Sequence, residues 1–182
     1  MVTPRLETIC IALAQVLIAR KLSMVTAESC TGGLIAASCT QLSGSSAWFE
    51  RGFVTYSNAA KSELLGVAPC LIEAQGAVSE EVAKAMALGA LAHSPAHISV
   101  AVTGIAGPTG GSDAKPVGTV WLAWAWRDLQ QNLHSETMLR QFEGTRSQVR
   151  DATAELALAH LTELVEKLVG KLLETTGKKI PT

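Results

Sequence analysis

One stretch of the sequence, residues 44–61, brings together three side-chain types that can share a nucleophilic reaction. It holds the hydroxyl of Ser46, the phenol of Tyr56 and the amine of Lys61. A serine hydroxyl can attack a carbonyl carbon when a neutral amine takes its proton, and a tyrosine hydroxyl can assist. The alternative is a solvated Lys61 and a Ser46 that only caps a helix, because most charged side chains lie in water.

Lys61 can act as a base only if it loses its proton. An ordinary lysine pKa of about 10.4 leaves about one amine in 2,500 neutral at pH 7, so the pKa must fall by roughly 3 units, or about 4 kcal/mol. The sequence predicts Lys61 near the first turn of a helix capped at Ser57 or Asn58, where the helix dipole supplies at most about 1–2 kcal/mol. Desolvation beneath a substrate or a second nearby cation has to provide the rest.

Two further segments have the composition of anion sites. Residues 104–118 contain five glycines and two prolines, which leave backbone N–H groups free to converge on a phosphate. They are not a P-loop, because no Gly-Lys-Ser/Thr follows, and they could equally form a long turn between strands. Residues 26–33 place hydroxyls and glycines between a predicted strand and a predicted helix. The candidate binding residues in and beside these segments are Ser29, Thr31, Gly32, Thr103, Gly104, Gly107, Gly110 and Gly111.

Other reactive side chains are weaker candidates. Arg146 begins the last predicted helix and could share a phosphate with the glycine-rich segment, although an exposed helix face is the simpler interpretation. Cys30 is disfavoured as a nucleophile because no histidine lies within these segments to activate it. His93 and His97 are separated by Pro95, which breaks the helix that would put both on one face. We therefore expect no metal and no cofactor.

The composition excludes several classes of protein. The 182 residues suit a single domain over 1–182, with a frayed tail at 175–182. Fifteen Lys and Arg against sixteen Asp and Glu leave no excess positive charge, which argues against a nucleic-acid-binding protein. No apolar stretch reaches the roughly 20 residues that cross a membrane, and no secretory leader is recognisable. Four cysteines without C-x-x-C spacing suit reduced thiols, so the predicted location is cytoplasmic.

Strands and helices alternate along the chain until an antiparallel pair of strands closes the pattern. Helical spacing of apolar residues predicts a first helix from about Pro4 to Lys21 and a long last helix after Thr145. This order predicts a three-layer α/β domain around a mixed sheet. The predicted strands are 24–28, 53–56, 98–102, 119–126 and 136–140, and the helices between them begin near residues 34, 58 and 80.

Several motifs are more specific together than any is alone. They are Thr26-Ala-Glu-Ser-Cys-Thr-Gly-Gly33, Gly44-Ser-Ser-Ala-Trp-Phe-Glu-Arg-Gly-Phe-Val-Thr-Tyr-Ser-Asn58 with Lys61, Gly76-Ala-Val-Ser79, and Gly104-Ile-Ala-Gly-Pro108 with Gly110-Gly111 and Lys115-Pro-Val-Gly-Thr-Val120. Over about residues 5–165 they resemble the CinA C-terminal-domain family, and within it the stand-alone nicotinamide-nucleotide amidohydrolases, or NMN deamidases. The resemblance implies a three-layer α/β/α sandwich with a five-stranded mixed sheet.

The resemblance also implies an activity. It is hydrolysis of the carboxamide of nicotinamide mononucleotide to nicotinic acid mononucleotide and ammonia, in pyridine-nucleotide salvage. The family's serine nucleophile falls on Ser46, with its tyrosine and lysine on Tyr56 and Lys61. Backbone N–H groups near Ser46 would then stabilise the oxyanion. The remaining expected site residues are Ser29, Asn58 and Thr103, with Arg146 and the glycine-rich segment on the phosphate.

Two other functions stay open at this point. A module that binds a pyridine nucleotide without cleaving it would use the same loops. An interaction protein in competence or DNA-damage responses is suggested by the family's name alone, and the near-neutral charge argues against direct contact with DNA. The long last helix could pair across a two-fold axis, so we expect a homodimer.

Overall fold

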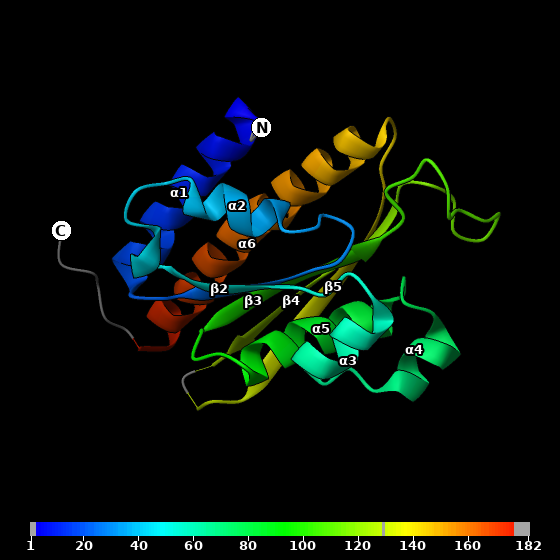
Figure 1. Ribbon diagram of the computed structural model, residues 1–182. Coiled ribbons are helices and arrows are strands. Elements are labelled where there is room, and N and C mark those ends of the chain that lie inside the picture. Colours follow the sequence, from blue (N-terminus) through cyan, green and yellow to red (C-terminus); the bar gives the residue numbers. More distant parts are fainter. Residues whose placement is uncertain (1–2, 129, 177–182) are drawn as a thin grey trace.

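The chain folds into three layers, with a five-stranded sheet between two layers of helices (Figure 1). The structure is a computed structural model that describes residues 3–128 and 130–176. The sheet has the order β2-β1-β3-β4-β5. β1 is parallel to both β2 and β3, whereas β3, β4 and β5 pair antiparallel. The strands are β1 (Met24–Glu28), β2 (Phe49–Val54), β3 (Ile98–Gly104), β4 (Thr119–Arg127) and β5 (Leu133–Gln141).

The helices divide between the two faces of the sheet, which confirms the predicted α/β/α sandwich (Figure 1). One face carries α1 (Pro4–Arg20), α2 (Leu34–Thr40) and α6 (Arg146–Thr176). The opposite face carries α3 (Asn58–Leu65), α4 (Pro69–Gln75) and α5 (Glu80–Ala92). None of the helices in the described ranges combines the length and apolar composition that a membrane crossing requires.

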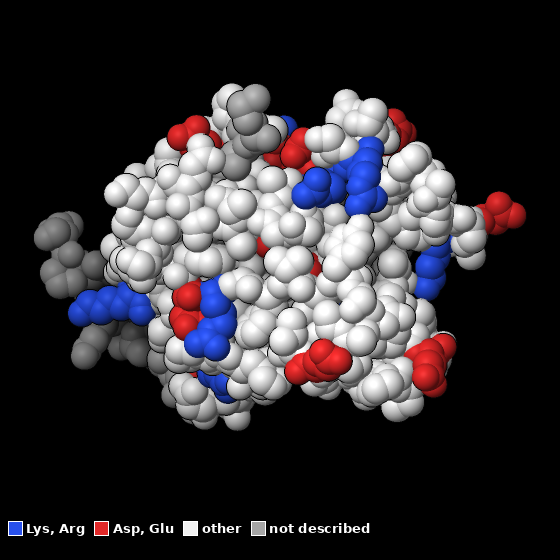
Figure 2. Space-filling view, in the orientation of Figure 1, with Lys and Arg blue, Asp and Glu red and all other residues white. Residues whose placement is uncertain are grey.

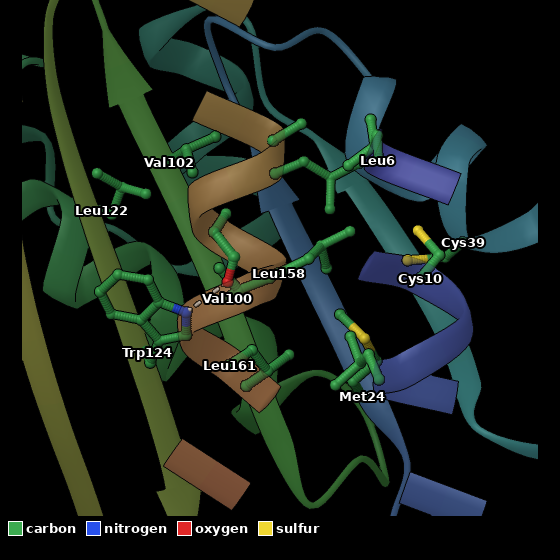
Figure 3. Close-up of a cluster of buried hydrophobic side chains, with 14 of the residues drawn as sticks. Leu6, Cys10, Met24, Cys39, Val100, Val102, Leu122, Trp124, Leu158 and Leu161 are labelled. Carbon is green, nitrogen blue, oxygen red and sulfur yellow. Dashed lines mark hydrogen bonds between the residues drawn. The ribbon is translucent and has the colours of Figure 1, made fainter. Parts of the chain in front are cut away.

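Alternating side chains of the central strands fill two separate cores. In β1, Met24 packs with the α1 and α6 side chains, whereas Val25 packs under α5. This alternation follows from the two-residue period of a strand that is covered on both faces. The α1–α6 core contains the larger groups, among them Trp124, whose indole N–H donates to the carbonyl of Ala157 at 3.0 Å (Figure 3).

Helix α3 lies close to α5 because α5 has a glycine at the crossing. A Cβ at Gly89 would lie 2.1 Å from the carbonyl oxygen of Leu65, the last residue of α3. Only a residue without a side chain therefore allows this approach. The contact matters for the site because α3 is the helix that carries Lys61.

The structure corrects several predicted boundaries. The second strand is at 49–54 and not at 53–56, because Glu50, Arg51 and Gly52 lie on an edge strand that has no apolar alternation to reveal it. Helix α4 was not predicted, since it is seven residues long and has no side-chain cap. β5 is longer than the predicted 136–140. Helix α6 continues through Thr176, so residues 175–176 of the expected frayed tail are helical, and 177–182 lie outside the described residues.

Candidate active site

A pocket of about 230 Å³ opens where the parallel strands β1, β2 and β3 end. The carboxyl ends of parallel strands lie at one edge of a sheet, and in open α/β sheets ligands bind beyond this edge. The turn before α5 and the first residue of α6 complete the wall. The lining residues are Ser29, Cys30, Tyr56, Asn58, Lys61, Ala77, Val78, Thr103, Gly104, Ala106 and Arg146.

Lys61 is a buried lysine whose amine points at a serine. It is 1% exposed, and its Nζ donates to Ser29 Oγ at 3.0 Å and to the carbonyl of Thr55 at 2.9 Å. Helix α3 positions it: the Ser57 hydroxyl caps the helix by accepting from the N–H of Ala60. Burial lowers the pKa of Lys61, because the charged ammonium loses its hydration there. The lowered pKa is a shift toward the neutral amine, and the hydroxyl of Ser29 lies within hydrogen-bond distance of that amine.

Ser29 stands in the turn between β1 and α2. Its backbone N–H donates to the carbonyl of Val102 in β3 at 3.0 Å, which ties the turn to the neighbouring strand. The next residue, Cys30, also lines the pocket, whereas Thr31 is completely buried outside its lining. A serine in a turn between a strand and a helix is also found in the α/β-hydrolases, where it is the nucleophile and the next residue's N–H stabilises the oxyanion.

The neighbouring Cys30 is not poised as a nucleophile. It is 6% exposed, and burial raises the pKa of its thiol to about 11. A thiol with this pKa is protonated at neutral pH, and the thiolate is the reactive form. Cys30 therefore serves as a small apolar wall of the pocket.

Ser46 does not lie in this pocket. It is exposed in a short 3₁₀ helix, η1 (Ser45–Ala47), which precedes β2, whereas Lys61 follows the other end of that strand. Six residues of strand separate the two ends by roughly 20 Å at about 3.3 Å per residue. In the parallel register, Phe49 pairs with Met24 at one end of the two strands, and Val54 pairs with Glu28 at the other end. Ser46 and Lys61 therefore lie at opposite ends of β2. The expected contact between Ser46 and Lys61 is therefore wrong, and Ser29 takes the place beside the amine.

Tyr56 lies at the mouth of the pocket rather than between Ser29 and Lys61. Its side chain is 59% exposed, and its hydroxyl accepts from Arg146 Nη2 at 2.7 Å. The other terminal nitrogen of Arg146 donates to the carbonyl of Gly107 at 2.8 Å. Arg146 thus joins the end of β2 to the glycine-rich loop, and it brings a positive charge to the rim. No hydrogen bond links Tyr56 to Ser29 or Lys61 among the described residues.

The other predicted binding residues divide into two groups. Asn58, Thr103 and Gly104 line the pocket together with Ser29, and the Thr103 hydroxyl donates to the carbonyl of Ala77 at 2.8 Å. The second group lies outside the lining: Thr31, Gly32, Gly107, Gly110 and Gly111. The Thr31 hydroxyl instead donates to Glu28, and Gly110 and Gly111 are exposed in the loop.

Sequence reasoning missed several lining residues. Ala77, Val78 and Ala106 carry no reactive group, so only the fold could reveal their position. Glu28 also escaped notice, although a carboxylate at the end of an otherwise apolar strand was a usable signal. Within 3–128 and 130–176, no three His, Cys, Asp or Glu side chains are grouped as metal ligands.

Comparisons with known proteins agree with this architecture. Nicotinamide-nucleotide amidohydrolase PncC of Enterobacter agglomerans is 51% identical over 154 residues, which is 85% of this chain and 92% of that protein. PncC of Pseudomonas putida is 55% identical over 141 residues, 78% of this chain and 85% of its own length. The crystal structure of competence/damage inducible protein CihA from Agrobacterium tumefaciens superposes with a TM-score of 0.82 at 43% identity, and covers 90% of this chain and 98% of that one.

The family profile described as CinA C-terminal domain matches residues 6–165, nearly the span over which the motifs suggested the resemblance. All four motif segments fall inside this range, and each of them contributes residues to the lining of the pocket. The chain therefore belongs to the CinA C-terminal domain family.

Proposed function

We propose that this protein hydrolyses the carboxamide of nicotinamide mononucleotide, with Ser29 as the nucleophile and Lys61 as its base. The observation that carries the proposal is the 3.0 Å contact between Lys61 Nζ and Ser29 Oγ inside the pocket. The relatives described above that bear the name nicotinamide-nucleotide amidohydrolase support the choice of substrate.

The chemistry follows from the two side chains. Neutral Lys61 keeps one hydrogen on the carbonyl of Thr55 and takes the proton of Ser29, whose oxygen forms a bond to the amide carbon. The amide oxygen gains negative charge, which the backbone N–H of Cys30, the residue after Ser29, stabilises. The C–N bond then breaks, the Lys61 proton passes to the leaving nitrogen, and ammonia departs. A water molecule, deprotonated by Lys61, cleaves the ester and restores Ser29.

The substrate itself helps to keep Lys61 neutral. The ring of nicotinamide mononucleotide is a pyridinium cation, and it carries the carboxamide that must reach Ser29. A cation near Lys61 disfavours the ammonium form and lowers its pKa further than burial alone. In this proposal both sources of a lowered lysine pKa that the sequence analysis left open act together: burial in the free protein and the nearby cation of the substrate.

Arg146 is the group we assign to the nucleotide's phosphate. Its guanidinium stands at the rim of the pocket, on Tyr56 and Gly107, within reach of a ligand that extends outward from Ser29. A guanidinium binds a phosphate through charge-assisted hydrogen bonds, each worth about 1.5–3 kcal/mol. Binding energy from this remote group positions the amide without taking part in the reaction.

Replacing Arg146 with alanine should weaken binding of the mononucleotide but not the chemical step. We expect KM for nicotinamide mononucleotide to rise about 10- to 100-fold, which corresponds to about 1.4–2.7 kcal/mol, with kcat within about threefold. Nicotinamide riboside lacks the phosphate, so its KM should not change. Arg140→Ala, on exposed β5, is the matched control. An equal rise in KM for the riboside would contradict the assignment.

The proposed function is tested directly with the unmodified protein. Nicotinamide mononucleotide is incubated with it, and ammonia and the nucleotide products are measured by a coupled assay and by chromatography. We expect ammonia and nicotinic acid mononucleotide in equal amounts. Binding measured by calorimetry without any product would contradict hydrolysis and favour a module that only binds the nucleotide. The homodimer and the cytoplasmic location stay predictions.

A further inference from the structure

Glu28 is a buried carboxylate that the reaction described above does not use. It is the last residue of β1, directly precedes Ser29 and is 0% exposed. Among the described residues it has no ion pair with a Lys, Arg or His side chain. Its oxygens instead accept four hydrogen bonds, from Thr31 Oγ1 at 2.7 Å, Gly33 N at 3.0 Å, Ile35 N at 3.0 Å and Ala36 N at 2.8 Å.

These bonds make Glu28 the cap of helix α2 from an unusual position. A helix is ordinarily capped by the side chain of its N-cap residue, but here that residue is Gly33, which has none. Glu28 lies five residues earlier, in the strand, and satisfies backbone N–H groups that the helix leaves free. One carboxylate thus ties the end of β1 to the start of α2 across the turn that holds Ser29.

Glu28 is also connected to the base. Its backbone carbonyl accepts from the N–H of Thr55 at 2.7 Å, and the carbonyl of Thr55 accepts from Lys61 Nζ at 2.9 Å. The side chain of Glu28 therefore orders the turn with the nucleophile, while its main chain holds the segment that receives the amine. Both partners of the Ser29–Lys61 contact are positioned relative to this one residue.

We infer that Glu28 is a positioning residue for the amide hydrolysis: its carboxylate holds the turn 29–33 so that Ser29 Oγ meets Lys61 Nζ and the Cys30 N–H faces the developing oxyanion. The inference rests on the proposed function. Complete burial of a charged carboxylate is costly unless hydrogen-bond donors surround it, and a neutral side chain would fill the same space at lower cost. A misplacement of about 1 Å at a reacting group costs about 10²-fold in rate.

The same geometry gives Thr31 a role other than the predicted contact with substrate. Its hydroxyl is directed at Glu28 Oε2 and is completely buried. Thr31 is one of the four donors that fix the carboxylate, so it acts through Glu28. This provides a second, milder way to disturb the turn.

The main test is Glu28→Gln, which keeps the size of the side chain and removes its charge. One oxygen becomes an NH₂ group, which cannot accept from the helix N–H groups. We expect kcat for nicotinamide mononucleotide to fall about 50-fold, with KM within about threefold. Thr3→Ala is the matched control, because Thr3 caps α1 by accepting from Leu6 N and its loss should lower stability without lowering kcat.

A milder pair of variants keeps the inference testable if Glu28→Gln does not fold, as judged by circular dichroism. Thr31→Val removes one donor at constant shape, and we expect a five- to tenfold loss of kcat at unchanged KM. Thr31→Ser retains the hydroxyl and should recover kcat to within about twofold. A folded Glu28→Gln with wild-type kcat, a Thr31→Val with wild-type kcat, or a loss confined to KM would overturn the inference. An inactive wild-type protein would overturn the proposed function itself, and this inference with it.

Discussion

Ser29→Ala should reduce amide hydrolysis about 10³-fold or more, whereas Ser46→Ala should leave kcat within about threefold. Ser29 Oγ is the oxygen next to the lysine amine, and no other hydroxyl makes a hydrogen bond to that amine among the described residues. Without the oxygen no acyl-enzyme can form, and removal of a nucleophile costs the largest part of a covalent enzyme's rate. A factor of 10³ corresponds to about 4 kcal/mol of transition-state stabilisation.

The two variants control each other, because both remove one serine hydroxyl next to a strand, Ser29 after β1 and Ser46 before β2. Initial rates of ammonia release at saturating nicotinamide mononucleotide give the comparison, and thermal unfolding verifies that both proteins are folded. Mass spectrometry of a quenched reaction should find the acyl group on the peptide that contains Ser29. An inactive Ser46→Ala beside an active Ser29→Ala would reverse the assignment and return the nucleophile to Ser46.

Lys61→Met should reduce kcat about 10³-fold, within the 10²- to 10⁴-fold range of a general base. Methionine has a similar length and is apolar, so it fills the buried position of Lys61 without a proton acceptor. Lys84→Met, on the exposed side of α5, is the control for the substitution itself and should retain full activity. A Lys61→Met protein with more than about a tenth of the wild-type kcat would contradict the role of base.

The pH dependence of the wild type follows from the same amine. Burial lowers the pKa of Lys61 from 10.5, and only the neutral form can take the proton of Ser29. The kcat/KM of the wild type should therefore rise with pH until the lowered pKa of Lys61 is passed, and then level off below pH 10.5. Lys61→Met should lack this rise, which is measured as a pH–rate profile of each protein.

The stability of the fold should depend on the same ionisation. Because the folded pKa of Lys61 is lowered, the unfolded chain binds one more proton in the window between that pKa and 10.5. The free energy of unfolding contributed by this residue therefore rises with pH across the window and is lowest on its acid side. Urea unfolding of the wild type and Lys61→Met at several pH values should accordingly find that the wild type gains on the variant as pH increases.

Much of the fold could be predicted because it depends on local patterns. The apolar run of β3 and the helical spacing after Pro4 and Thr145 each repeat a period that one sheet or one helix imposes. The edge strand β2 could not be placed correctly, because several of its residues are exposed to water and do not pack in a core. Its sequence therefore lacks the apolar alternation that marks a strand. Helix α4 is stabilised by its contacts with other helices, and its seven residues are too few to give a recognisable helical pattern.

Most residues of the candidate site could be predicted from the sequence, but the contacts between them could not. Lys61 was conspicuous because a lysine at the start of an apolar-faced helix opposes the dipole, and the structure confirms that it is buried. Ser29 and Thr103 were named as residues of the same site, and both line the pocket. The resemblance placed the nucleophile on Ser46, but the serine in contact with Lys61 is Ser29, so the expected contact between Ser46 and the amine is absent among the described residues.

The sequence by itself determined the class of domain, the family and the chemical inventory of Ser29, Tyr56, Lys61 and Arg146, because residue types and periodicities are properties of the chain. Only the tertiary structure decided which serine meets the amine. The contact between Ser29 and Lys61 joins residues 32 positions apart in the sequence. It exists because β1 and β2 run parallel, so the residues that follow the two strands come together at one end of the sheet. Residue 46 precedes β2 and therefore lies at the opposite end. The pairing of β1 with β2 joins segments far apart in the sequence, so it is visible only when the strands are placed side by side in the sheet.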